Sequence, residues 1–419
     1  PPRSTLFPYT TLFRSSNYSY LEDDYQLLHD FVRSYMDIES ITTGKKEDAW
    51  KLRFIGTLRN PEQSEMVFDL FEQKSKPYKL TPLLSEEDGK HYLFFVNEVK
   101  SSKKSNPKTN LILFIITIIS VLFTGGLYST PSLPEEFGLE TILLMMKNGW
   151  PFAIAILAIL GAHEMGHYIA GRKHGVNVTL PYFIPLPVIS PFGTMGAFIN
   201  MKSIPKNKKQ LFDIAIAGPI SGIVVAIPII ILGLFLSQVE PLPTQIPVDG
   251  GLQMEGNSLL YLGLKYLVFG ELLPRPLSYE GLTPIVYWLR YFFTGQPFPF
   301  GGYDVMIHPV AWAGWAGILV TSLNLIPIGQ LDGGHILTAV FGKKARKTMP
   351  VFLVLMGLLG FAWSGWWFWA FILLFLGQLP SQMKDSVTSL DPIRKRIAIL
   401  MLILFVLVFT PVPLVVLIG

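Results

Sequence analysis

The sequence predicts a mainly α-helical, polytopic membrane protein preceded by a small soluble α+β domain. Half of the 419 residues are hydrophobic, and only 15% are charged. The mean hydropathy of +0.42 is too high for an ordinary soluble protein of this length. Long apolar runs alternate with short basic clusters, as expected for membrane spans and their topology signals. We therefore expect an integral, multi-pass protein whose first partner is the lipid bilayer.

Charge and cysteine content exclude several other classes of protein. The formal net charge is +4, and the basic residues stand between apolar runs instead of forming one broad surface. This pattern predicts no nucleic-acid partner. The chain has no cysteine, which excludes disulfides, cysteine zinc ligands and a cysteine nucleophile. Nothing in the composition indicates an oligomeric state.

The N-terminal region divides into a tail and a small domain. Residues 1–15 (PPRSTLFPYTTLFRS) resemble translated adapter or vector sequence, so we interpret them as non-native, with a native disordered tail as the alternative. Residues 16–99 predict a soluble α+β domain with helices at 21–36 and 61–75, a strand at 49–58 and a hairpin turning at Asp88-Gly89. The domain shows no catalytic pattern, so we expect a regulatory or binding role.

The membrane region follows a basic linker at 100–108 and fills residues 109–419. Spans are expected at 110–128, 150–170, 211–237, 309–326 and 397–418, with two short helices in 350–379 that turn near Ser364-Gly365, and with interfacial helices in 257–295. Each basic cluster falls on one side of this arrangement, which makes that side cytoplasmic. The N-terminal domain is therefore expected in the cytoplasm.

The segment AILGAHEMGHYIAG places His163, Glu164 and His167 inside an apolar run. On a helix, the two histidines lie on one face one turn apart, so that both can bind one metal ion. Glu164 is offset by about 100° and stays free to hold a proton. Zinc bound in this way activates water for attack on a carbonyl, with the glutamate as base. The alternative is a structural polar cluster between helices.

A catalytic zinc ion needs a third protein ligand, and NLIPIGQLDGGHI (Asn324 to Ile336) supplies candidates. We favour Asp332 as the ligand, because two histidines and one carboxylate are a common catalytic set. His335 remains a rival ligand or a supporting residue. Asn324 precedes the helix break at Pro327 and could donate a hydrogen bond to a developing oxyanion.

These motifs, together with AGPISG (Ala217 to Gly222), resemble the site-2 protease family of intramembrane zinc metalloproteases, peptidase family M50. The loop between the motifs shows no PDZ pattern, so the chain is most similar to the gravitropism-deficient-type branch without that domain. The resemblance implies one Zn²⁺ per chain held by His163, His167 and Asp332, with Glu164 as catalytic base and Asn324 as a catalytic helper.

The resemblance also implies an intramembrane endopeptidase that hydrolyses peptide bonds within or near transmembrane segments of membrane-protein substrates. We expect its opening on the cytoplasmic side of a bacterial inner membrane or of a plastid membrane. The alternatives are a membrane metal transporter, for which Asp213 is the only further candidate site, and a non-catalytic scaffold.

The Pro- and Gly-rich segment 185–201 is unsuited to a spanning helix, and GAFIN alternates like a strand. We expect a re-entrant hairpin lining the active site. A substrate helix must unwind before its backbone can be cut, and a strand edge could hold the unwound segment extended. Candidate substrate-binding residues are Gly193, Thr194, Gly196 and Ala197, with a purely structural loop as the alternative.

Overall fold

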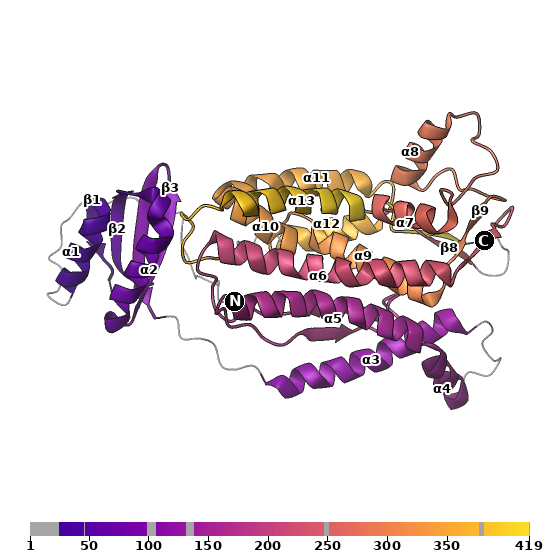
Figure 1. Cartoon of the computed structure of the whole chain (residues 1–419), viewed down its shortest axis with the longest axis horizontal. Helices are drawn as coiled ribbons and strands as arrows, with labels where there is room; N and C mark the ends of the chain where they lie inside the picture. Colours follow the sequence, from indigo (N-terminus) through magenta and orange to yellow (C-terminus); the bar gives the residue numbers. More distant parts are fainter. Residues whose placement is uncertain are drawn as a thin grey trace. The chain divides into compact units, whose positions relative to one another are not determined.

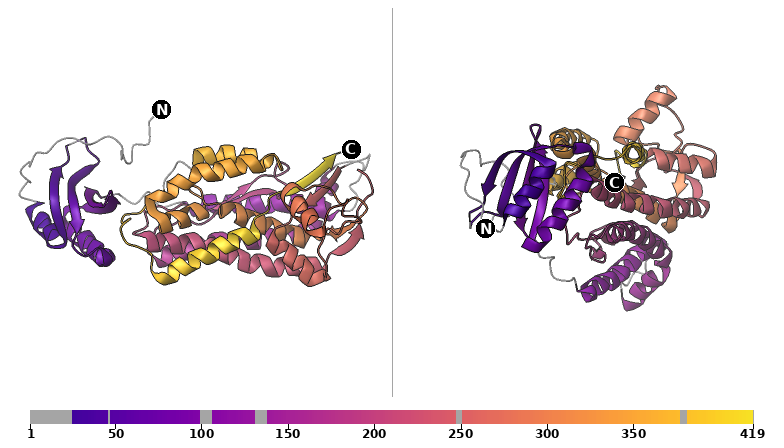
Figure 2. Two further views of the ribbon diagram at one scale, coloured as in Figure 1. Left: turned by 90° about the horizontal axis from the view of Figure 1, so that it is seen from above. Right: turned by 60° about the vertical axis from the view of Figure 1, so that its left-hand side comes forward.

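The computed structural model describes residues 25–45, 47–98, 106–130, 138–246, 251–376 and 381–418 (Figure 1). The interpretation of residues 1–15 as a tail therefore lies outside the described residues. These described residues form two compact units, the first drawn from within 1–103, 202–211 and 382–394 and the second from within 104–201, 212–381 and 395–419. The protein is mostly helical, with a small sheet in the first unit (Figures 1 and 2).

The first unit has a four-stranded antiparallel sheet of order β1-β2-β4-β3 and two helices. Its elements are α1 (Gln26–Tyr35), β1 (Met36–Thr43), β2 (Trp50–Leu58), α2 (Ser64–Ser75), β3 (Leu80–Glu87) and β4 (Lys90–Asn97), with single 3₁₀ turns at Pro61–Gln63 and Lys76–Tyr78. Fully buried aromatic and aliphatic side chains from sheet and helices form its core, including Phe54, Phe68, Phe71 and Phe95.

The predicted hairpin is confirmed by the pairing of β3 with β4. Glu87 pairs with Lys90, and Asp88 and Gly89 both have positive φ, at 50° and 76°. Two consecutive residues of this conformation match the right-handed twist of the flanking strands. The strand β1 was not predicted, because its alternation of small polar and apolar residues is weak.

Two segments from far along the chain complete the first unit. Asp385 bridges the edge of the sheet, where the Leu84 N–H donates to the Lys384 carbonyl at 2.8 Å and the Ser386 N–H donates to the Leu84 carbonyl at 2.9 Å. Lysines of both segments pair with acids on one face of α2, in the pairs Lys209–Glu65, Lys206–Asp69 and Lys384–Glu72. The predicted soluble domain is thus joined by connections from the membrane region.

The second unit consists of helices and short two-stranded sheets. Its helices are α3 (Pro107–Ser129), α4 (Leu139–Asn148), α5 (Trp150–Lys173), α6 (Lys208–Phe235), α7 (Leu259–Phe269), α8 (Pro284–Thr294), α9 (Pro309–Asn324), α10 (Asp332–Phe341), α11 (Met349–Leu359), α12 (Gly365–Leu376) and α13 (Pro392–Val408), with a 3₁₀ segment at Gly342–Thr348. Its strand pairs are β5 (Tyr182–Pro185) with β6 (Thr194–Phe198), β7 (Gln238–Pro241) with β9 (Tyr303–Met306), and β8 (Gly251–Glu255) with β10 (Leu414–Ile418).

Among the described residues, α3, α5 and α6 are long and apolar enough to cross a membrane. They match three of the expected spans. The expected span at 309–326 is the helix α9, whose 16 residues are shorter than a full crossing. The run 350–379 contains two short helices, α11 and α12, separated around Ser364 as predicted.

The prediction of a last span over 397–418 is wrong at its C-terminal end. The helix α13 ends at Val408, and residues 414–418 form β10, the yellow arrow near the C-terminus in Figure 2, which pairs with β8. Pro411 and Pro413 end the helix, because a proline lacks the backbone donor and disfavours helical geometry in the residue before it. The β-branched Val415 and Val416 suit a strand.

Candidate active site

The side chains of His163, His167 and Asp332 converge at one point. The two histidines come from α5 and the aspartate from the first turn of α10. The Nε2 atoms of the histidines are 3.3 Å apart, and Asp332 Oδ2 lies 3.2 Å from His163 Nε2 and 3.3 Å from His167 Nε2. Within the described part of the chain, this is the one group of three such residues with ligand atoms close enough for a shared metal ion.

These distances fit a tetrahedral zinc ion. Zinc binds histidine nitrogen and carboxylate oxygen at about 2.0–2.1 Å, and tetrahedral angles then separate the ligand atoms by about 3.3 Å. The three atoms therefore already form one triangular face of such a site. The fourth position would remain for water or substrate.

The histidine His167 is oriented by a carbonyl group of α6. Its Nδ1 lies 2.7 Å from the Ile214 carbonyl oxygen, so Nδ1 donates a proton there. When the ring is neutral, as in a metal site, the lone pair of Nε2 then faces Asp332. A backbone acceptor that fixes the tautomer in this way is the usual support of a metal-binding histidine.

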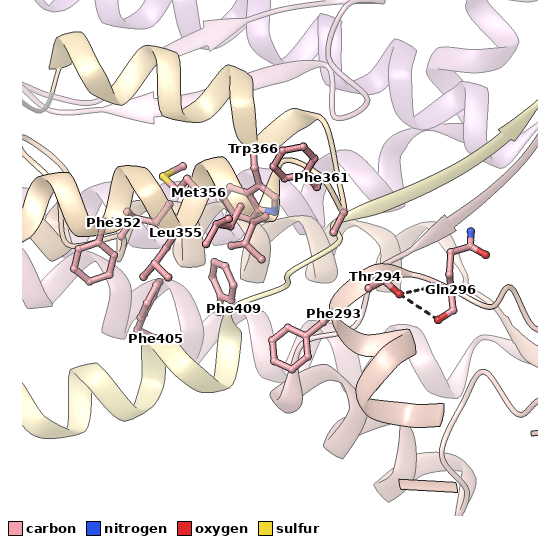
Figure 3. A pocket seen from close by; sticks show the side chains of 14 residues that line it. Phe293, Thr294, Gln296, Phe352, Leu355, Met356, Phe361, Trp366, Phe405 and Phe409 are labelled. Atoms are coloured by element: carbon pink, nitrogen blue, oxygen red, sulfur yellow. Dashed lines mark hydrogen bonds between the residues drawn. The ribbon is translucent and has the colours of Figure 1, made fainter. Parts of the chain in front are cut away.

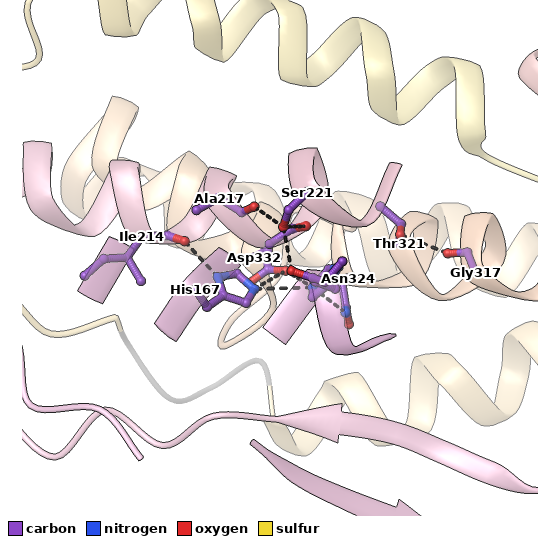
Figure 4. Close-up of polar contacts among 11 residues, drawn as sticks. His167, Ile214, Ala217, Ser221, Gly317, Thr321, Asn324 and Asp332 are labelled. Carbon is purple, nitrogen blue, oxygen red and sulfur yellow. Dashed lines mark hydrogen bonds and ion pairs between the residues drawn. The ribbon is translucent and has the colours of Figure 1, made fainter. Parts of the chain in front are cut away.

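The helix α6 approaches α5 closely because it carries small residues at the contact (Figure 4). A Cβ atom on Gly218 would lie 2.1 Å from His167 Nε2, and one on Gly222 would lie 3.1 Å from His163 Nδ1. The Ser221 hydroxyl lies 2.8 Å from the Ala162 carbonyl of α5 and 2.6 Å from the Ala217 carbonyl of its own helix. The AGPISG segment thus makes room for the two histidines.

The aspartate Asp332 follows a tight break between α9 and α10. A Cβ on Gly333 would lie 2.0 Å from the Leu325 carbonyl oxygen, and one on Gly334 would lie 2.4 Å from the Gly329 carbonyl oxygen. Only glycine permits this close approach of backbone to backbone. The break turns the chain so that the first residue of α10 faces α5.

Two further side chains border the three ligand atoms. Glu164 is only 5% exposed, and the backbone amide of Ile199, just after β6, hydrogen-bonds its carboxylate. Asn324 is the last residue of α9, and its Nδ2 lies 3.4 Å from His163 Nε2 (Figure 4). The structure therefore places an acid, an amide and three ligands around one buried point.

The rival ligand His335 and two further histidines of the membrane region lie outside this group. His335 is buried, but its Nδ1 lies 2.8 Å from the Ser381 hydroxyl, and it is outside the three-ligand group. His174, the residue after α5, has its Nε2 atom 3.0 Å from Asp213 Oδ2, so Asp213 of α6 contacts the end of α5. His308 accepts the N–H of Val310 at the start of α9.

The strands β5 and β6 form a hairpin over residues 182–198, so its first strand lies mostly before the expected range 185–201; re-entry into a membrane stays a prediction. Gly193 has a φ of 70° and packs on α3, where its carbonyl accepts a hydrogen bond from Ser120. The Thr194 hydroxyl donates to the Ile184 carbonyl and accepts the Gly196 N–H at 3.0 Å. Ala197 pairs with Phe183. These contacts brace the hairpin internally.

Sequence reasoning missed how α6 supports the site. The Ile214 carbonyl and the absence of a side chain at Gly218 are both needed for the position of His167. Every residue has a backbone carbonyl, so the sequence does not indicate which one binds a histidine. The glycine did stand in the AGPISG segment, where small residues four apart on an apolar helix indicate close helix contact.

Comparison with known families and proteins gives a consistent result. Residues 151–361, half of the chain, match the profile of peptidase family M50. The chain is 28% identical over 332 residues to a rice (Oryza sativa subsp. japonica) protein named "Probable zinc metalloprotease EGY1, chloroplastic", a match that covers 70% of this chain and 50% of that protein. It is also 28% identical over 295 residues to the Arabidopsis thaliana protein named "Probable zinc metalloprotease EGY2, chloroplastic", covering 70% of this chain and 47% of the relative.

The chain spans about half the length of the curated relatives it matches. No solved structure matches it significantly.

Proposed function

Because the chain belongs to peptidase family M50, as its motifs predicted, we propose that it is a zinc endopeptidase that cuts membrane-protein substrates within or near their transmembrane segments. The observation that carries this proposal is the spacing of 3.2–3.3 Å between three ligand atoms from two histidines and one aspartate. The relatives named as zinc metalloproteases support zinc as the metal. His163, His167 and Asp332 would hold the ion, one per chain.

Zinc held there would lower the pKa of a water molecule and polarise the carbonyl group under attack. Glu164 would take the proton from the attacking water and deliver it to the leaving amine. Its place directly after His163, and the amide of Ile199 that holds its carboxylate, support this role. The Asn324 amide, at the edge of the site, would donate a hydrogen bond to the developing oxyanion.

The hairpin β5–β6 offers a binding site for the unwound substrate. In the described residues, β6 pairs with β5 alone, which leaves its other edge without a strand partner. The residue after β6 contacts Glu164, so a chain laid along this edge would pass the catalytic base. We propose that the substrate adds an extended strand here, with Gly193, Thr194, Gly196 and Ala197 shaping the hairpin.

We further propose a cytoplasmic position for the N-terminal domain and the opening of the site. The first unit joins the domain to residues 202–211 and 382–394. These connections precede α6 and α13, and one compact unit must lie on one side of a membrane. Residues 202–211 carry four lysines and no acid, and Arg394 begins the basic RKR run 394–396 at the start of α13, as expected on the cytoplasmic side.

Glu164→Gln tests the proposed function. The purified variant in liposomes should keep zinc at the wild-type ratio while cleavage of single-span substrates falls about 10²- to 10⁴-fold, because the general base is lost. Glu140→Gln, at an exposed glutamate of α4, is the matched control and should cleave normally. Wild-type protein that binds zinc but cuts no member of a broad substrate panel would contradict the proposal and favour a transporter or a scaffold.

A further inference from the structure

A second buried polar cluster lies outside the three-ligand site, around β8, α7 and β9. Glu255, Lys265 and Asp304 are 7%, 0% and 2% exposed. Lys265 Nζ lies 3.6 Å from Asp304 Oδ1 and 4.8 Å from the centre of the Tyr261 ring. The Tyr261 hydroxyl donates to Glu255 Oε1 at 3.0 Å. The cluster therefore holds two carboxyl groups and one lysine side chain.

This cluster carries one negative charge in excess when all three groups are ionised. Burial raises the pKa of the Glu255 carboxyl, and Lys265 opposes this effect only in part. A buried carboxylate is stable only when a cation or enough hydrogen-bond donors compensate it. Within the described residues of the cluster, the ionised Glu255 has the Tyr261 hydroxyl, its own backbone N–H and the attraction of Lys265, which Asp304 shares.

A cavity of about 700 Å³ opens beside Glu255. Next to Glu255 it is lined by Asn257, which is 8% exposed and whose Oδ1 has no hydrogen-bond partner among the described residues. The remaining wall is apolar and aromatic, and comes mainly from α7, α8 and the C-terminal segment, with Leu259, Tyr279, Trp288, Tyr291, Phe292 and Val412. Its volume is in the usual range of small-molecule sites.

The polar end of this cavity is held in place by the helix that leads to Asn324. Trp315 of α9 donates through Nε1 to the Gly256 carbonyl at 2.8 Å, between Glu255 and Asn257. The polar end of the cavity is therefore fixed by a hydrogen bond from α9.

A neighbouring cavity of about 810 Å³ serves for comparison, because its lining is almost entirely apolar (Figure 3). It lies among α11, α12, α13 and the end of α8, and it shares Phe293 with the first cavity. Its lining includes Thr294 and Gln296 but no charged side chain. The carboxylate is thus the feature that distinguishes the first cavity.

We propose that the cavity beside Glu255 binds a small amphiphilic cation, with a primary ammonium group at Glu255 and Asn257 and an apolar body between α7 and α8. Both side chains offer oxygen acceptors, which suits an ammonium group with three donors. Trp288 and the tyrosines of the wall provide aromatic faces that favour a cation. A neutral amphiphile would leave Glu255 uncompensated, and an anion would be repelled.

The test compares n-octylamine, which is a cation at pH 7.5, with n-octanol, which has the same chain and no charge. Binding to the full-length protein in zwitterionic nanodiscs is measured by titration calorimetry. We expect wild-type protein to prefer octylamine. Glu255→Gln keeps the acceptor for Tyr261 and should weaken octylamine binding about tenfold or more, since a charge-assisted hydrogen bond is lost, with octanol unchanged. Glu271→Gln, at a partly exposed glutamate that pairs with Arg275, is the matched control and should bind as wild type.

Leu289→Trp, on the cavity wall, leaves every charge in place and should weaken both ligands by filling the space. Equal binding of amine and alcohol to wild type would overturn the proposal, as would an unchanged preference in a folded Glu255→Gln variant. A soluble peptide with one lysine among leucines is the competitor. If it displaces octylamine at equal concentration, the ligand is a peptide and the assignment to a small amphiphile is overturned.

Discussion

Alanine at Gly218 should displace His167 from the metal site. The new Cβ would lie 2.1 Å from His167 Nε2 and 2.5 Å from the adjacent ring carbons. Carbon and nitrogen atoms in van der Waals contact are about 3.5 Å apart, so the ring or the helix must move by about 1.4 Å. Metal sites tolerate shifts of only about 0.2 Å in ligand distance. Because α6 also carries the Ile214 carbonyl that orients His167, a movement of α6 that removes the clash would break this hydrogen bond.

The same substitution at two other glycines gives a graded series. At Gly222 the added Cβ would lie 3.1 Å from His163 Nδ1, which requires a shift of about 0.4 Å. At Gly161, on α5 beside the motif, the added Cβ would meet nothing within 4 Å. Loss of an outer support typically lowers metal affinity or activity about 10- to 100-fold. We expect about a hundredfold loss or more at Gly218, about tenfold at Gly222 and less than twofold at Gly161.

Zinc content, by plasma mass spectrometry, and cleavage in liposomes measure both consequences of this series. The order of loss should be Gly218→Ala, then Gly222→Ala, then Gly161→Ala. Full zinc occupancy and wild-type cleavage in a folded Gly218→Ala protein would refute the reasoning, because His167 would then not depend on the space that this glycine leaves.

Three further predictions concern the first unit, which contains the N-terminal domain, and the metal. Burial lowers the pKa of His91, whose Nδ1 accepts the Leu58 N–H at 3.1 Å. The unfolded chain takes up this proton near pH 6.5, so the stability of the unit should be level above about pH 7.5 and fall as the pH drops through about 6.5. Urea unfolding followed by proteolysis should show this loss of stability at low pH, and the His91→Gln variant should have a stability that depends less on pH. Asp385 is fully buried and accepts the N–H groups of Val387 and Thr388. Asp385→Ala should therefore cost about 2–4 kcal/mol of unfolding free energy in the same assay, against less than about 0.5 kcal/mol for the exposed Asp30→Ala. Removal of zinc by a chelator should abolish cleavage, and added zinc should restore it. The urea midpoint for unfolding of the first unit should stay unchanged.

The metal ligands were accessible from sequence because two of them are local to one helix. A spacing of four residues places His163 and His167 on one face of α5 in any helix. Asp332 stood out as an acid in an apolar segment with an irregular backbone, and the structure brings it to the histidines. Each of these signals is contained within a few residues.

The supports of the site were hidden because they join distant parts of the chain. The Ile214 carbonyl acts through the backbone 47 residues after His167. The packing of Asp385 against the sheet edge likewise follows from tertiary contacts, which no periodicity records. In the C-terminal segment the signal was present, since Pro411 and Pro413 mark the end of α13, but the continuous hydropathy concealed the strand after them.

X-ray absorption at the zinc edge on the full-length protein tests the central claim most directly. We predict one zinc ion per chain with nitrogen and oxygen ligands at about 2.0–2.1 Å, two of them imidazoles, and no sulfur. Replacement of Asp332 by alanine should remove one oxygen ligand and weaken binding. A spectrum with three imidazoles, which would bring His335 to the metal, or an unchanged spectrum in the Asp332→Ala variant would contradict the account.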